Sequence, residues 1–141
     1  MADFARGIKA GILASIVYSL AYGLILLAIP AIILAGIWSP FWESYWAIIA
    51  LSTLVFAVVG GIVFGIIWGI IFAAVYDSLP SNSPIVKGIV LGIVYWLIVD
   101  VLFSLAFLGS IEYLIFSFIL GALLFGSLLG LFWNVFKGPG K

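Results

Sequence analysis

Long apolar runs separated by short polar breaks dominate the sequence. The runs cover about residues 7–37, 45–76, 84–108 and 111–136. Each run exceeds the roughly 20 residues that an α-helix needs to cross the hydrocarbon core of a bilayer. The pattern predicts an all-α fold in which residues 1–141 form a single transmembrane domain, a bundle of four transmembrane helices.

Prolines along the chain, two of them preceded by serine, mark where helices are expected to bend, end or begin. Pro30 interrupts the first run, and because proline removes a backbone hydrogen bond we expect a kink or an end of the helix there. Ser39-Pro40 and Ser83-Pro84 each match an N-cap followed by proline at the first helical position. The second and third helices are therefore expected to begin close to these two pairs.

Composition makes the bilayer the solvent of this protein. Hydrophobic residues make up 67% of the chain and charged residues 7%, whereas a soluble domain carries about 25% charged residues. We expect a multi-pass integral membrane protein, with the cell membrane as its location and membrane lipids among its partners. The formal net charge of zero offers no basic footprint for nucleic acid, so no nucleic-acid partner is expected.

Two residue types that carry much of enzyme chemistry are missing from the sequence. The chain has no Cys and no His. It therefore lacks thiolate nucleophiles, the commonest general base and the commonest zinc and haem ligand. We expect a protein that is not an enzyme and that has no catalytic residue, cofactor or metal site.

The basic residues predict an orientation. All five lie at the N-terminus, in the second loop or at the C-terminus, which share one side of a four-helix topology: Arg6, Lys9, Lys87, Lys137 and Lys141. The other side carries Glu43 and Glu112 and no basic residue. Because basic loops stay in the cytoplasm, both termini are predicted to be cytoplasmic.

Aromatic residues gather on the side opposite the termini. They are Trp38, Phe41, Trp42, Tyr45 and Trp46. Such a cluster is typical of the interfacial belt of a membrane protein. The alternative interpretation is a ledge on which a partner protein docks.

Two pairs of segments suggest an internal duplication. RGIKAG at residues 6–11 resembles KGIVLG at 87–92, and GIVFGIIWG at 61–69 resembles GALLFGSLLG at 121–130. The pairs are consistent with two repeated helical hairpins. Similar composition alone is the alternative explanation.

Small residues recur every four positions and so share one face of each helix. Such a face lets a second backbone approach closely, which is a main source of helix association in lipid. The contact is expected within the bundle or on another subunit, and the number of such faces favours an oligomer or a larger complex. The glycines are Gly7, Gly11, Gly61, Gly65, Gly69, Gly88, Gly92, Gly126 and Gly130.

Asp100 stands inside the apolar run YWLIVDVLFSL, residues 95–105. It lies on the four-residue spacing of Gly88 and Gly92, so we expect it to face protein. A charge at that depth costs about 2.5–3.5 kcal/mol on insertion scales. Polar residues considered with it are Tyr18, Ser19, Tyr22 and Ser127, and Asn134 nearer the cytoplasm.

Three roles for Asp100 remain open. It is a structural residue bonded to hydroxyls, the partner of a cation on another subunit, or a proton or cation site. The leading hypothesis for the chain is a non-catalytic subunit that packs through its glycine faces against other membrane helices, in a homo-oligomer or a larger complex. The alternative is a small transporter or channel that uses Asp100.

Overall fold

The computed structural model describes residues 2–34, 40–106 and 110–137, and every regular element in these ranges is helical. Trp38 lies outside these ranges, and the side chains of Trp42, Tyr45 and Trp46 are likewise outside what is described. The predicted interfacial aromatic belt therefore stays a prediction.

The first hairpin consists of α1 (Phe4–Leu34) and α2 (Pro40–Val75), followed by a 3₁₀ turn, η1 (Tyr76–Ser78). Helix α1 continues through Pro30 to Leu34, so the proline does not end it. Helix α2 has Pro40 as its first residue, as the Ser39-Pro40 pair predicted, and so begins five residues before the apolar run at residue 45. Proline is tolerated there because the first N–H groups of a helix have no intrahelical partner.

The second hairpin is built from two runs, each interrupted by a π-helical segment. The outgoing run is α3 (Pro84–Tyr95), η2 (Trp96–Val101) and α4 (Leu102–Ala106). The returning run is α5 (Ile111–Ser117), η3 (Phe118–Phe125) and α6 (Gly126–Val135). Ser83 occupies the N-cap of α3 as predicted, although its side chain makes no capping hydrogen bond. The sequence did not predict the π-helical segments, a feature that is frequent at functional sites.

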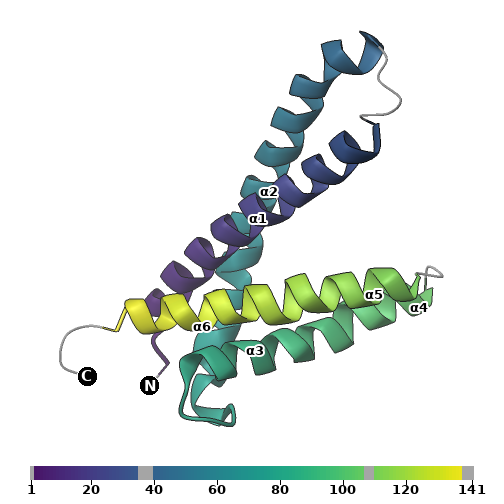
Figure 1. Cartoon of the computed structure of the whole chain (residues 1–141). Helices are drawn as coiled ribbons and strands as arrows, with labels where there is room; N and C mark the ends of the chain where they lie inside the picture. Colours follow the sequence, from purple (N-terminus) through teal and green to yellow (C-terminus); the bar gives the residue numbers. More distant parts are fainter. Residues whose placement is uncertain (1, 35–39, 107–109, 138–141) are drawn as a thin grey trace.

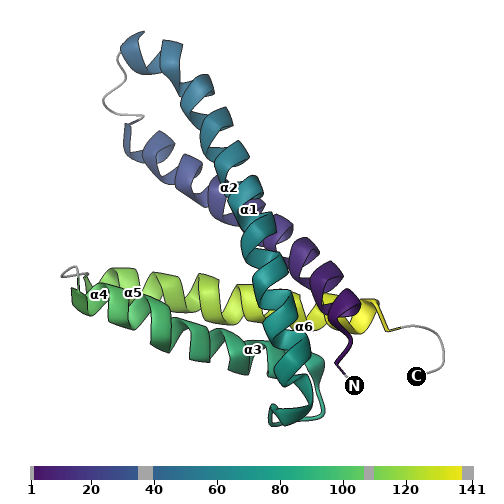
Figure 2. The ribbon, with the colours of Figure 1, turned by 180° about the vertical axis from the view of Figure 1, so that it is seen from behind.

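The two hairpins cross near the termini and diverge toward their other ends, so the molecule has the shape of a V (Figures 1 and 2). The start of α1 lies beside the end of α6, where the Arg6 Nε donates a hydrogen bond of 2.7 Å to the carbonyl oxygen of Trp133. The buried apolar core comes from the halves of the helices nearest the termini and includes Ala10, Phe72 and Leu129. The outer halves of the hairpins lie beyond this core.

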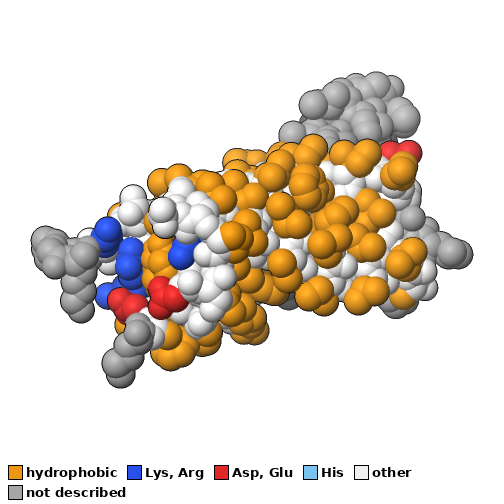
Figure 3. Space-filling view, turned by 90° about the horizontal axis from the view of Figure 1, so that it is seen from below, with side chains coloured by type: hydrophobic (Ala, Val, Ile, Leu, Met, Phe, Trp, Pro, Cys, Tyr) orange, Lys and Arg blue, Asp and Glu red, His pale blue; other side chains and the backbone are white. Residues whose placement is uncertain are grey.

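The described part of the chain contains four helical stretches long and apolar enough to cross a membrane, as expected of a multi-pass membrane protein. They are 22 to 25 residues long, with a mean hydropathy of 1.7 to 2.6. Hydrophobic side chains cover most of the face shown in Figure 3, while Lys and Arg side chains gather at one end of it. This surface suits lipid along its length and water at that end.

Candidate functional site

The glycines of the first hairpin bring the backbones of α1 and α2 into direct contact. A methyl group on Gly11 would overlap the carbonyl oxygen of Gly65, and a methyl group on Gly65 would overlap that of Gly11. Gly7 and Gly69 oppose each other in the same reciprocal way. No side chain fits between the two helices at these positions.

Two serines continue this contact along α1, toward the end where the two hairpins diverge. Ser15 is buried and donates a hydrogen bond of 2.7 Å from Oγ to the carbonyl oxygen of Gly11. The Oγ of Ser19 lies where a methyl group on Gly61 would have to be. Ser19 therefore packs against α2 rather than serving as a hydrogen-bond partner of Asp100.

The second hairpin is closed in the same manner. A methyl group on Gly88 would overlap the carbonyl oxygen of Gly126, and one on Gly92 would lie 3.0 Å from the Cα of Ala122. A methyl group on Gly130 would overlap the carbonyl oxygen of Pro84. The small-residue faces thus meet in pairs inside the hairpins. These glycines make their close contacts within each hairpin, and the expectation of an oligomer or a larger complex stays a prediction.

A chain of cation–π and stacking contacts, which we call the aromatic clamp, joins the hairpins at the end near the termini. The Arg6 guanidinium lies 4.3 Å from the ring centroid of Trp133, which stacks on Tyr76 with the centroids 4.6 Å apart. The Lys87 Nζ lies 4.1 Å from the Tyr76 ring centroid and donates a hydrogen bond of 2.6 Å to the carbonyl oxygen of Tyr76. The clamp draws on both hairpins and explains how the Lys87 side chain is buried.

Replacing Lys87 by methionine is expected to lower the free energy of unfolding by about 2 kcal/mol, because the variant loses a desolvated cation–π contact and a charged hydrogen bond. Reversible unfolding in mixed dodecylmaltoside and SDS micelles measures this change. Lys9→Met is the control, since Lys9 is exposed. Equal stability of the two variants would show that the clamp does not hold the hairpins together.

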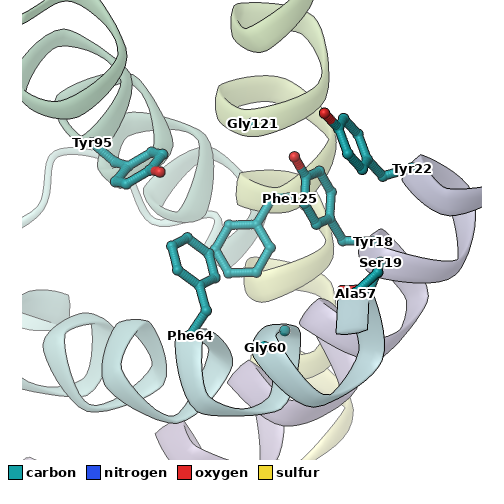
Figure 4. A pocket seen from close by; sticks show the side chains of 10 residues that line it. Tyr18, Ser19, Tyr22, Ala57, Gly60, Phe64, Tyr95, Gly121 and Phe125 are labelled. Carbon is teal, nitrogen blue, oxygen red and sulfur yellow. The ribbon is translucent and has the colours of Figure 1, made fainter. Parts of the chain in front are cut away.

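A cavity of about 330 Å³ lies between the hairpins, on the side of the core where they begin to diverge. Figure 4 shows aromatic side chains from α1, α2, α3 and η3 around it. Its volume is within the range of small-molecule sites. The lining residues are Tyr18, Ser19, Tyr22, Ala57, Gly60, Gly61, Phe64, Tyr95, Gly121 and Phe125.

The aromatic walls of the cavity support one another. The rings of Phe64 and Phe125 have centroids 5.2 Å apart, and Phe64 meets Tyr95 edge to face at 5.6 Å. Tyr18 meets Phe125 edge to face at 5.7 Å and stacks on Tyr22 at 6.0 Å. Contacts of this kind fix ring orientation, so the cavity presents ordered aromatic surfaces together with phenolic hydroxyls.

Asp100 lies within η2, five residues after the cavity-lining Tyr95, and the residue is 9% exposed. Its Oδ1 accepts a hydrogen bond of 3.0 Å from the Tyr113 hydroxyl. It also lies within electrostatic reach of Tyr18 and Tyr95, which line the cavity. Because the π-helical turn closes i to i+5, Asp100 lies nearer the face of Tyr95 than an α-helix would place it.

The structure separates the polar residues predicted for the membrane interior. Tyr18 and Tyr22 line the cavity, whereas Ser127 is half-buried in α6 and Asn134 is exposed near the end of that helix. Sequence reasoning missed Tyr113 as the hydroxyl partner of Asp100. Asp100 lies ten residues before Ser110 and Tyr113 three residues after it, so spacing about the turn between the last two predicted helices gives no signal for this pair.

The arrangement presents groups that can bind a ligand through non-covalent contacts. It offers aromatic faces, hydroxyls and one carboxylate, and the described residues contain no group of three or more His, Cys, Asp or Glu that could hold a metal ion. Comparison with protein-family models, with curated proteins and with solved structures finds no match. The functional interpretation therefore depends on the geometry of this chain.

Proposed function

We propose that this chain is a non-catalytic multi-pass membrane protein that binds a small molecule between its two hairpins and carries it across the membrane. The observation that carries the proposal is the aromatic cavity of about 330 Å³, whose lining residue Tyr95 lies five residues before the buried Asp100. Each hairpin is already closed by its own glycine contacts, so this space is left between two separately packed units. A packed structural bundle has no need of such a cavity.

We also propose how the chain is oriented in the membrane and how its two hairpins move. Arg6, Lys9 and Lys87 share the end that carries the aromatic clamp, and the positive-inside rule places that end in the cytoplasm. The cavity then faces the outer side, where the hairpins diverge. The hairpins, which the sequence predicts to be repeats, would move as units, and opening the clamp would release the solute into the cytoplasm.

A second candidate function, membership of a homo-oligomer or a larger membrane complex, is favoured by a different surface. Leu51, Val55 and Val59 are exposed along the outer half of α2, on the side away from the glycine contacts. Lipid or the helix of another subunit would cover them. In this interpretation the contact with other membrane helices is this apolar face and not the glycines.

A cysteine at position 57 is expected to react with a water-soluble thiol reagent. Ala57 lines the cavity, and because the chain has no Cys the Ala57→Cys variant carries a single thiol. The thiolate, which forms in water and not in lipid, attacks the sulfenyl sulfur of a methanethiosulfonate to form a mixed disulfide and displaces methanesulfinate. We expect reaction from the outer side of oriented proteoliposomes, and faster reaction from the cytoplasmic side when Lys87→Met weakens the clamp.

Val63→Cys is the matched control. Val63 is on the same helix but 57% exposed on its outer face, where lipid would surround the thiol. The proposal requires Ala57→Cys to react and Val63→Cys to remain unmodified. Failure of Ala57→Cys to react from either side would mean that lipid or protein fills the cavity, which would favour the subunit function.

A further inference from the structure

We infer that the molecule bound in the cavity is an organic monocation about the size of a single-ring quaternary ammonium ion. The inference rests on the proposed function, because it assigns a chemical class to the solute of the same cavity. It depends on the aromatic faces, on the charge of Asp100, and on the distribution of basic residues along the chain.

The aromatic walls are suited to a cation. The ring face of an aromatic side chain is negative, and cages of such rings bind quaternary ammonium groups. The cavity is lined by rings from both hairpins, three of which are tyrosines: Tyr18, Tyr22, Phe64, Tyr95 and Phe125. Most of these rings already meet in edge or stacked contacts, so little ordering is required when a ligand enters.

Asp100 supplies the charge that makes a cation preferable to a neutral molecule. Its carboxyl group is buried, and Tyr113 contributes a hydrogen bond but no positive charge. No Lys or Arg occurs in the sequence between Lys87 and Lys137, and Lys87 is bound to Tyr76 in the clamp. A carboxylate at membrane depth is costly unless it is protonated or paired, and a bound cation would stabilise its charged form.

Tyr18 and Tyr95 connect the charge with the cavity. Both line the cavity, and both are within electrostatic reach of Asp100. Their phenolic oxygens carry partial negative charge and stabilise a nearby cation through their dipoles, since a quaternary ammonium ion has no N–H to donate. An anion of the same size would meet the carboxylate and the negative ring faces and be rejected.

The test compares two isosteric probes, phenyltrimethylammonium and neutral tert-butylbenzene. Binding of each to the full chain in nanodiscs of zwitterionic lipid is measured by calorimetry against empty nanodiscs. We expect the cation to bind at least about tenfold more tightly, because the Asp100 carboxylate attracts its charge in a site of low dielectric. Asp100→Asn should remove that preference. Gly121→Leu should abolish binding of both probes, because a Cβ on Gly121 meets only open space and the side chain would fill the cavity.

Each outcome is decisive for one of the two proposals. If the two probes bind with equal affinity and neither binds to Gly121→Leu, the cation assignment is overturned. The cavity would then be a binding site for apolar molecules. Cation binding unchanged in Gly121→Leu, or a preference unchanged in Asp100→Asn, would overturn the cation assignment too. Absence of any binding would also overturn the inference. In that case the reactivity of Ala57→Cys would still decide between a solute cavity and a filled one.

Discussion

Replacing Gly65 by alanine is expected to destabilise the first hairpin, whereas the same replacement at Gly60 is expected to stabilise it slightly. A Cβ on Gly65 would overlap the carbonyl oxygen of Gly11 and the Oγ of Ser15, while a Cβ on Gly60 has no atom within 4 Å. Backbone cannot move aside as a flexible side chain does, so α1 and α2 would have to separate. In open space alanine favours the helix by about 1 kcal/mol over glycine.

The expected loss at Gly65 is about 3 kcal/mol, at the upper end of what overpacking usually costs. Reversible unfolding in mixed micelles, followed by circular dichroism, measures both variants under the same conditions. Gly60 and Gly65 are only five residues apart in the same helix, so the micelle affects the stability of both variants in a similar way. Equal and small changes at Gly65 and Gly60 would contradict the close contact between α1 and α2.

Tyr113→Phe is expected to lower the free energy of unfolding by about 1–3 kcal/mol, because it removes the hydrogen bond that the buried Asp100 accepts. Adding Asp100→Leu should restore most of the loss, since replacing both partners by apolar groups is often nearly neutral. The double variant should nevertheless lose its preference for phenyltrimethylammonium over tert-butylbenzene. Adding Asp100→Leu to Tyr113→Phe would thus raise the free energy of unfolding and at the same time remove the preference for the cation.

A double-mutant cycle over unfolding and calorimetry measures both properties. If the double variant is no more stable than Tyr113→Phe alone, the Asp100–Tyr113 contact is not what stabilises the second hairpin. If it keeps the cation preference, Asp100 has no part in binding. Asp100→Leu alone completes the cycle, with Tyr113 free to reach water or lipid headgroups because its side chain is 41% exposed.

The helices could be predicted from the sequence because their length and apolarity are local properties. Apolar runs longer than about 20 residues are a strong signal in a chain with so few charges, and Ser83-Pro84 marks the start of α3 correctly. The ends were less certain: α1 begins at Phe4, three residues before the predicted residue 7, and it passes through Pro30. Terminal turns depend on capping and packing as well as on hydropathy.

The cavity could not be predicted because its residues have no common period. Tyr18, Phe64, Tyr95 and Phe125 come from four different elements, and only the crossing of the hairpins brings them together. The π-helical segments shift the register in the middle of both runs of the second hairpin, and nothing in an apolar sequence marks them. The glycine spacing predicted which helix faces carry small residues. It did not reveal that each of these faces packs against the other helix of the same hairpin.

Pulsed electron paramagnetic resonance across the V tests the central claim most directly, which is that the two hairpins move relative to each other as units when the clamp opens. Spin labels on Val55→Cys and Ile115→Cys, both at exposed positions of different hairpins, report the separation of the hairpins. Labels on Val55→Cys and Leu20→Cys, within the first hairpin, serve as the control. The account predicts a broad or two-component distance distribution across the hairpins and a narrow one within the hairpin. Equally narrow distributions for both pairs would contradict it and identify a static bundle.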